Sequence, residues 1–328
     1  MFNWKTSPLT WPHFLAMLIG TVVILLVALL VVMYTIYWQR KIIAWMQGRI
    51  GPNRVGPLGL LQSAADVLKL LIKEDVIPAK ADRALFLIAP IIAFVPAFVT
   101  LSFIPFTMTH VFTAGLGIGV LLYIALSAIT IHGVMLGGWA SNNKYALLGG
   151  MRSAAQMLSY EIPLGMSIIG IVLMSGTLNL NSIVEQQHTG WWNIVPQFLG
   201  FLIFLIAGTA ELNRTPFDLP EAESELVGGY HTEYTGFRFA FFMLTEYVYL
   251  FAMGSLVATL FLGGWSGPFL PGWLWFVIKA FLYINFQSWL QATMPRLRTD
   301  QLMTFSWKIL LPLSLVNLVI TAVLKVIV

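Results

Sequence analysis

The residues with the clearest capacity for chemistry are carboxylates, and they gather in one stretch of the chain. The segment 211–238, ELNRTPFDLPEAESELVGGYHTEYTGFR, holds six of the 14 acidic residues. Asp218 and Glu221 fit a D-x-x-E capping pattern at a helix start, where the helix dipole favours acid. Glu225 does not fit this structural explanation, because it lies four residues after Glu221 and repels it on a helix. The excess acid therefore indicates a functional role. The six acids are Glu211, Asp218, Glu221, Glu223, Glu225 and Glu233.

Two more carboxylates, Glu161 and Glu246, fall inside apolar runs. A charged side chain near the centre of a membrane helix costs about 2.5–3.5 kcal/mol, so such a residue is a functional candidate by default. Helix rise places Glu161 about 13 Å from Arg152 and Glu246 about 12 Å from Arg238, below the acidic stretch. With Glu211 they predict a staggered set of buried acids that exchange protons near neutral pH. The structural alternative is that each acid pairs with a lysine or hydrogen-bonds to a neighbouring helix.

The composition is typical of a polytopic helical membrane protein. The chain is 58% hydrophobic and 10% charged over 328 residues, with repeated uncharged runs near 20 residues. The first run, 14–38, lacks a small-residue cleavage site, which favours a span over a signal peptide. We predict an all-α fold in a single membrane domain, 1–328, with eight transmembrane helices. They are expected at about 14–38, 84–105, 112–139, 153–175, 194–212, 239–262, 273–293 and 305–326.

The distribution of lysine and arginine predicts the orientation in the membrane. Of 18 basic residues, 15 fall in the first, third, fifth and seventh connections, and none in the even connections. Lys5, Lys325 and the intramembrane Lys279 make up the remainder. By the positive-inside rule the odd connections are cytoplasmic and both termini lie on the outer side. The acidic stretch then faces the cytoplasm.

Two of the cytoplasmic connections have recognisable local patterns. In the first, RIGPNRVGP at 49–57 predicts a turn that presents Arg49 and Arg54. Residues 57–73 then form an apolar and a polar stripe at spacings of three and four, which predicts an interfacial amphipathic helix. Asp66 on the polar stripe either pairs with a lysine on a solvated surface or helps frame an opening for a lipid-soluble ligand. The third connection, GGWASNNKYALLGGMR, is predicted to be a short, tight link without chemistry.

Residue counts exclude several kinds of chemistry. The chain has no cysteine, which excludes disulfides, thiolate zinc sites and a cysteine-ligated iron–sulfur cluster. Only His132 among the five histidines lies well inside a span, so no facing pair could ligate haem. The GLGIG segment at 115–119 follows no strand and indicates helix packing, not a nucleotide loop. The formal charge of +4 is too small and dispersed to favour nucleic acid. Electrons for any nearby redox reaction must be carried by another chain.

Five segments, in this order, closely resemble one protein family: GRIGPNRVGP, ADVLKLLIKED, SNNKYALLGGMRSAAQMLSYEIPLG, ELNRTPFDLPEAESELVGGYHTEYTG and PRLRTDQLM. The family is the quinone-chamber membrane subunit (H subunit) of the proton-pumping NADH:quinone oxidoreductase, respiratory complex I. The resemblance covers about residues 38–310. It implies eight spans in a bacterial inner membrane, at the heel of the membrane arm. It also implies a subunit of an enzyme that is inactive alone and carries no catalytic residue itself.

The resemblance further implies roles for particular residues and partners. An acidic path would connect the quinone chamber to antiporter-like membrane subunits, through Glu161, Glu211, Asp218, Glu221, Glu223, Glu225 and Glu246. The chamber or its entry would be lined by Arg49, Arg54, Asp66, Arg296, Arg298 and Asp300. Quinone, either ubiquinone or menaquinone, would be the substrate. Flavin and the iron–sulfur cluster would belong to soluble partner subunits above, with small membrane subunits and lipid beside.

Three positions depart from the family pattern. Gln39 stands where the family usually has glutamate, Gln291 where an arginine is common, and Thr299 where tyrosine is usual. The first two remove one acid and one base of an interface pair, which changes the electrostatics of quinone entry.

Two other function classes stay open from the sequence. A related membrane subunit of a ferredoxin- or F420-dependent dehydrogenase, or of a membrane hydrogenase, would share the chamber and differ in its electron donor. An independent proton-coupled transporter is disfavoured, because the two halves show no matching broken helices or repeats.

Overall fold

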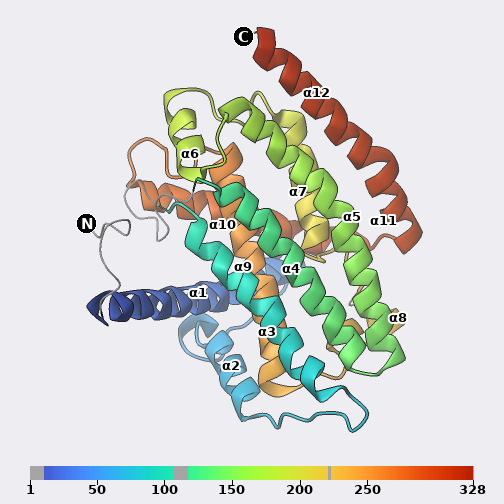
Figure 1. The fold of residues 1–328 in the computed structure, drawn as a ribbon. Helices are drawn as coiled ribbons and strands as arrows, with labels where there is room; N and C mark the ends of the chain where they lie inside the picture. Colours follow the sequence, from blue (N-terminus) through green and yellow to red (C-terminus); the bar gives the residue numbers. More distant parts are fainter. Residues whose placement is uncertain (1–10, 107–116, 221–222, 328) are drawn as a thin grey trace.

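The fold is all-helical, as predicted. A computed structural model describes residues 11–106, 117–220 and 223–327, and these contain no strand. Figure 1 shows the arrangement of the helices. Their bounds are α1 Trp11–Met46, α2 Gln62–Ile72, α3 Arg83–Thr100, α4 Gly119–Ala140, α5 Lys144–Ser175, α6 Leu180–Thr189, α7 Phe198–Glu211, α8 Glu223–Leu226, α9 Gly236–Phe261, α10 Gly272–Thr293, α11 Thr299–Phe305 and α12 Leu311–Ile327.

Six helical segments within the described ranges are long and apolar enough to cross a membrane. They are Leu18–Met46, Arg83–Phe103, Gly119–Ala140, Lys144–Ser175, Gly236–Phe261 and Thr299–Ile327. The predicted spans 194–212 and 273–293 contain the shorter or less apolar helices α7 and α10. At 14 residues α7 is about 21 Å long, less than the hydrocarbon core. Helix α10 contains Lys279 and Gln287 and is not among the six.

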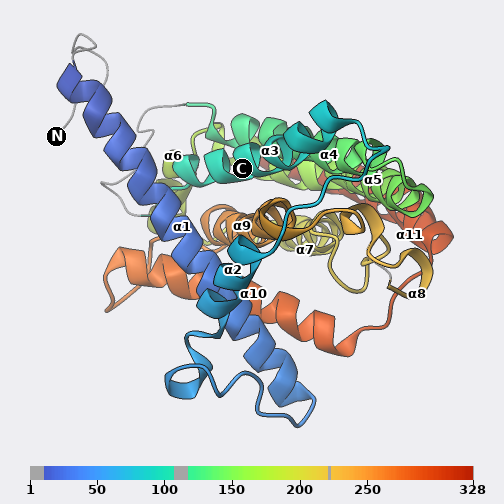
Figure 2. The same cartoon turned by 90° about the horizontal axis from the view of Figure 1, so that it is seen from below.

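The helices form layers around α9. Helices α3, α4 and α5 pack side by side in one layer, α7 and α9 lie behind them, and α10 packs on the far side of α9 (Figure 2). Helix α1 crosses this stack at a large angle beside α10 and α2. Of the apolar part of α9, 67% is buried, against 18% for α1. Helix α9 is therefore the central helix of the bundle.

The glycine-rich segment 137–152 differs from its prediction as a loop. Only residues 141–143 connect the two helices, and α5 begins at Lys144, capped by the Asn143 side chain. The glycines instead let α4 and α5 approach closely: a Cβ on Gly138 would lie 2.5 Å from the carbonyl oxygen of Ala146. Small residues at helix contacts serve this purpose in membranes.

Three other helical features bear on the site. The predicted amphipathic segment 57–73 contains a short 3-10 turn, Pro57–Gly59, followed by α2. Helix α6, which was not predicted, follows α5 in the connection expected on the outer side. The run from α11 to α12 is continuous but passes through a π-helix at Ser306–Leu310.

Candidate functional site

Two of the sequence-predicted acids meet inside the bundle. Glu211, the last residue of α7, and Glu246, in the middle of α9, line one cavity of about 30 Å³. Glu211 is 5% exposed, and Ser127 and Thr130 of α4 also line the cavity. A cavity of this size has room for one or two water molecules. The arrangement places two carboxylates from different helices against a polar, buried space.

Cationic and hydrogen-bonding groups surround Glu246. The Arg214 guanidinium lies 4.0 Å from one carboxylate oxygen, and His231 Nε2 lies 3.3 Å from the other. The Tyr230 hydroxyl donates to that second oxygen at 3.2 Å. Arg214 also stacks over the Tyr247 ring at 4.7 Å. Arg214 and His231 are both buried, so this acid has charged and polar protein partners inside the bundle.

The turn after α7 is what brings Arg214 to this position. Asn213 adopts a left-handed conformation with φ of 50°, which reverses the chain directly after the helix. The Gln156 side chain of α5 secures the reversal by donating to the carbonyl oxygens of Ala210 and Phe217, both at 2.8 Å. The sequence had drawn attention to the acids here, whereas Gln156 and His231 were not recognised as their supports. Their position within the same helix and loop as the acids was the only available signal.

Asp218 ties the acidic stretch to the last cytoplasmic loop. Its carboxylate accepts a hydrogen bond from Arg296 at 2.8 Å, and the backbone N–H of Leu297 donates to the Pro216 carbonyl oxygen at 3.0 Å. Burial raises the pKa of Asp218 above its ordinary value, while the positive charge of Arg296 opposes the rise. The structure thus joins a predicted path residue to a predicted chamber residue.

Two further acids of the stretch are described: Glu225 is exposed and Glu233 is half-buried. Glu225 pairs with Arg152 at 2.8 Å, and its side chain is 57% exposed. Glu233 accepts a hydrogen bond from Asn143 at 2.6 Å. Glu221 lies outside the described residues, and so does the side chain of Glu223, the first residue of α8. An exposed ion pair such as Arg152–Glu225 contributes little to stability.

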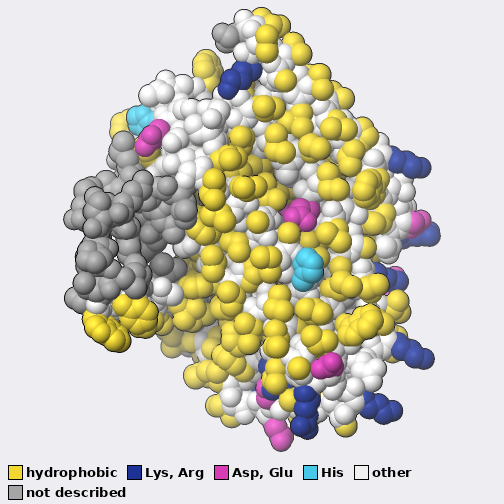
Figure 3. Space-filling model, viewed as in Figure 1, with side chains coloured by type: hydrophobic (Ala, Val, Ile, Leu, Met, Phe, Trp, Pro, Cys, Tyr) yellow, Lys and Arg dark blue, Asp and Glu magenta, His cyan; other side chains and the backbone are white. Residues whose placement is uncertain are grey.

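Glu161 occupies a different position from the cavity acids. It is half-buried on α5, beside an open hollow of about 480 Å³, and interacts electrostatically with His132 on α4. Figure 3 shows a mostly hydrophobic face with an acidic side chain and a histidine near its centre. Glu161 also lies within electrostatic range of Glu211. It therefore stands between the buried cavity and the surface of the bundle.

The predicted chamber residues fall on two parts of the fold. Arg49 and Arg54 are exposed on the segment between α1 and α2, and Asp66 on α2 pairs with Arg40 of α1 at 2.5 Å. Arg298 and Asp300 pair at 3.3 Å at the start of α11, both largely exposed.

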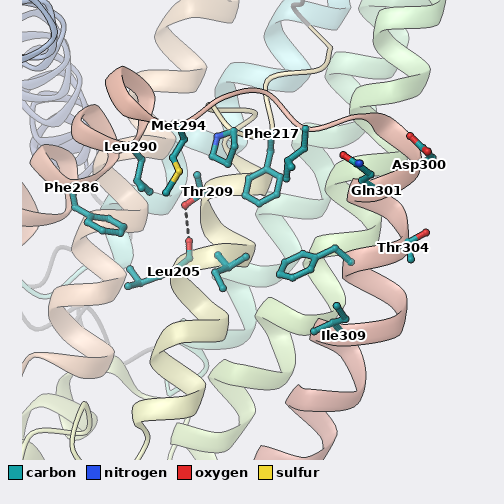
Figure 4. A pocket seen from close by; sticks show the side chains of 14 residues that line it. Leu205, Thr209, Phe217, Phe286, Leu290, Met294, Asp300, Gln301, Thr304 and Ile309 are labelled. Carbon is teal, nitrogen blue, oxygen red and sulfur yellow. Dashed lines mark hydrogen bonds between the residues drawn. The ribbon is translucent and has the colours of Figure 1, made fainter. Parts of the chain in front are cut away.

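A groove of about 790 Å³ opens beside Asp300. Figure 4 shows its walls: α7 contributes Leu205 and Thr209, α10 contributes Phe286 and Leu290, and α11 and the π-helix close the other side. The lining is mostly apolar, with polar groups at Thr209 and at the Asp300 end. Apolar pockets of this size with a few polar groups bind small molecules.

Two of the three departures from the family pattern, Gln39 and Gln291, contact each other. The Gln39 side-chain amide of α1 donates to the side-chain oxygen Oε1 of Gln291 on α10, and both side chains lie on the contact between these helices. Next to them, Trp38 donates to Asn285 at 2.7 Å. A neutral amide pair therefore occupies the place at which the sequence suggested a lost ion pair. In the described part of the chain, no three His, Asp or Glu side chains group as metal ligands.

Comparisons with known proteins identify the family of the chain. A family model described as NADH dehydrogenase matches residues 19–322. The H subunit of NADH-quinone oxidoreductase from Brevibacillus brevis is 62% identical over 319 residues, covering 96% of this chain and 94% of the relative. The protein of the same description from Bacillus cytotoxicus is 59% identical over 325 residues, covering 97% of each chain. The chain belongs to the NADH dehydrogenase family.

Proposed function

We propose that this chain is the H-type membrane subunit of a bacterial NADH-quinone oxidoreductase, complex I, and crosses the inner membrane eight times. Helices α7 and α10 would supply the two spans beyond the six that length and composition indicate. The placement of lysine and arginine supports outer termini and a cytoplasmic acidic stretch. The names of the relatives favour NADH as the electron donor over ferredoxin or F420.

In this role the chain lines the quinone chamber and couples quinone reduction to proton translocation. The observation that carries the proposal is the buried cavity shared by Glu211 and Glu246, next to Arg214 and His231. Two charges about 4 Å apart interact by roughly 4 kcal/mol at an effective dielectric of 20. The protonation of one closely spaced acid therefore depends on the protonation of the others, and a change of charge nearby alters all of them.

The acids form a route in three parts. Asp218, with Glu221, Glu223 and Glu225 on the same stretch, would sense the chamber on the cytoplasmic side. Glu246 and Glu211 would carry the response into the bundle. Glu161 would pass it to antiporter-like membrane subunits packed against the face formed by α4 and α5, because a half-buried acid on an apolar face needs a polar partner there.

Quinone, either ubiquinone or menaquinone, is the substrate in this proposal. It would enter beside α1 and α2, where Arg49, Arg54 and Asp66 lie, and Arg296, Arg298 and Asp300 would border the chamber from the α10–α11 side. Flavin and the iron–sulfur cluster would be bound by soluble partner subunits, since this chain has no cysteine.

The test is to replace the cavity acids in the assembled complex. Glu211→Gln and Glu246→Gln keep the shape of the side chain and remove its proton exchange. We expect each to lower NADH:quinone turnover and proton pumping at least about tenfold, equivalent to about 1.4 kcal/mol, with normal amounts of the subunit in the membrane. Glu233→Gln, an acid at the edge of the stretch, is the matched control. Parental turnover in both cavity variants would refute the proton-path assignment.

A further inference from the structure

A chain of polar groups begins at the floor of the groove. Thr209 lines the groove (Figure 4), and its hydroxyl accepts a hydrogen bond from the Gln287 amide of α10 at 2.8 Å. The same hydroxyl donates to the Leu205 carbonyl oxygen at 2.7 Å. Gln287 is 2% exposed, and its amide oxygen has no hydrogen-bond partner among the described residues. Gln287 therefore joins the groove-lining hydroxyl to the buried interior, and its amide oxygen can accept a further hydrogen bond.

Tyr283 continues this chain toward Glu211. It lies one turn before Gln287 on α10, and its hydroxyl packs against Gly208, where a Cβ would lie 3.3 Å away. The hydroxyl interacts with Gln287 and with Glu211, without the geometry of a direct hydrogen bond to either. Tyr123 of α4 lies within electrostatic range of both Glu211 and Tyr283.

The groups follow the surface of α7 from the groove to the cavity. Successive residues of an α-helix are rotated by about 100°, so Thr209 and Glu211 point about 160° apart. Gly208 lies between them, about 100° from Thr209 and 60° from Glu211. Tyr283, seated on Gly208, therefore bridges the two sides of α7. We call Thr209, Gln287, Tyr283 and Tyr123 the polar belt.

Four buried atoms along this route lack a partner in the described part of the chain. They are Gln287 Oε1, the hydroxyl oxygens of Tyr283 and Tyr123, and Glu211 Oε2. An unsatisfied buried polar group costs about 1–3 kcal/mol, and ordered water is its usual remedy. The phenol hydroxyls both donate and accept, so water between them and the carboxylate would complete a continuous hydrogen-bonded path.

We propose that the polar belt holds ordered water and gives Glu211 a second proton connection, running around α7 to the groove between α7, α10 and α11. A proton entering from groove water passes along hydroxyls and water to the Glu211 carboxylate, and another leaves by the reverse order. This inference rests on the proposed function, because it takes Glu211 to exchange protons during turnover. The belt does not involve Arg214 or His231, so it is separate from the route through the acidic stretch.

The alternative is that the same groups serve only packing between α7 and α10. Small and hydroxyl residues do this in many membrane helices. Packing alone predicts that isosteric removal of a hydroxyl changes stability and leaves proton transfer untouched, which separates the two explanations.

The experiment uses the assembled complex in proteoliposomes, with isosteric pairs of variants. Thr209→Val and Tyr283→Phe remove hydroxyls, Thr209→Ser keeps one, and Ser288→Ala removes a buried hydroxyl that bonds only within α10. We expect the first two to slow NADH:quinone turnover about three- to tenfold and to raise its solvent deuterium isotope effect. Thr209→Ser and Ser288→Ala should stay within about twofold of the parent in both measurements.

Parental turnover and isotope effect in both Thr209→Val and Tyr283→Phe would overturn the proposal. Glu211→Gln and Glu246→Gln in the same series separate the belt from the proposed function. If Glu211→Gln is slow while the belt variants are normal, only the belt fails. Normal turnover in Glu211→Gln removes the endpoint of the belt, and normal turnover in Glu246→Gln as well refutes the proposed function. If a belt variant does not assemble, a high-resolution density map of the parental complex decides. Water between Tyr283 and Glu211 supports the belt, and protein packing without water there refutes it.

Discussion

Glu246 in the cavity and Glu225 at the outer edge of the acidic stretch carry the same side chain in different surroundings. The Glu246 side chain is 16% exposed and has Arg214, His231 and Tyr230 as partners. The Glu225 side chain is 57% exposed and pairs with Arg152 alone. Water screens the second pair and hardly reaches the first. The clustering of acidic residues in the sequence therefore locates the candidate site. The burial of each side chain then decides which of these acids interact strongly with neighbouring charges.

The largest effect should come from removing the cation of the cavity. Arg214→Met leaves Glu246 buried beside a neutral side chain, and breaking a buried ion pair costs about 3–5 kcal/mol. We expect a clear fall in the melting temperature of the purified complex and in the amount of subunit retained in membranes. Arg214→Lys keeps the charge without the flat contact on Tyr247, and should fall between parent and Arg214→Met. An unchanged melting temperature in Arg214→Met would mean that the cavity acids are not charged in the resting protein.

A second prediction places a new acid in a buried site. Gln39 is 4% exposed and hydrogen-bonded to Gln291, so Gln39→Glu introduces a carboxylate without a cation and should destabilise the α1–α10 contact by about 1–3 kcal/mol. Adding Gln291→Arg supplies the partner. The double variant should recover, with a coupling energy of about 1–3 kcal/mol in a double-mutant cycle from thermal unfolding. Additive single effects would show that the two side chains do not form a pair.

The third prediction concerns Asp218, whose side chain is more buried than that of Glu225 and pairs with one arginine, Arg296. Its pKa is raised by burial, so the folded state binds this proton more tightly than the unfolded state. This contribution to stability is full below the ordinary pKa of about 3.9 and is lost as pH rises through the raised pKa. Relative to Asp218→Asn, the parental complex should therefore lose melting temperature as pH rises from the ordinary value. In Arg296→Met the opposing charge is absent, so the loss should move to higher pH. Parallel curves for parent and Asp218→Asn would contradict the assignment.

The smallest effect is expected at the outer edge. Arg152→Met removes the partner of an exposed Glu225, and exposed pairs contribute about 0–1 kcal/mol. The melting temperature should change little, and less still in high salt, where the pair is already screened. A loss as large as that of Arg214→Met would erase the distinction between the two regions.

Apolar runs made the helices of this fold predictable, because membrane helices need long stretches without charge. Glu211 at the end of α7 and Glu246 within α9 could be recognised for the same reason. The boundary of α5 could not, since glycines that end helices in water also let helices pack closely in membranes.

The partners of each site residue required the fold itself. His231 is 15 residues from Glu246 along the chain, and only the reversal at Asn213 and the turn before α9 set both Arg214 and His231 beside that acid. Gln39 and Gln291 were noticed separately and are joined by the packing of α1 on α10. Glu161 was predicted to be buried with the other acids, but the rotation of α5 leaves it half-exposed.

The π-helix Ser306–Leu310 allows one continuous helix to meet two different neighbours. A π-helical turn contains one more residue than an α-helical turn. The side chains that follow it are therefore rotated about the helix axis by about 100°. Before it, Gln301 and Thr304 line the groove; after it, Asn317 and Thr321 bond with Gln197 just ahead of α7. Deleting a single residue from the π-helix would restore regular α-helical winding. The side chains of Asn317 and Thr321 would then rotate away from Gln197. The extra residue of the π-helix therefore sets which face of α12 meets the rest of the bundle.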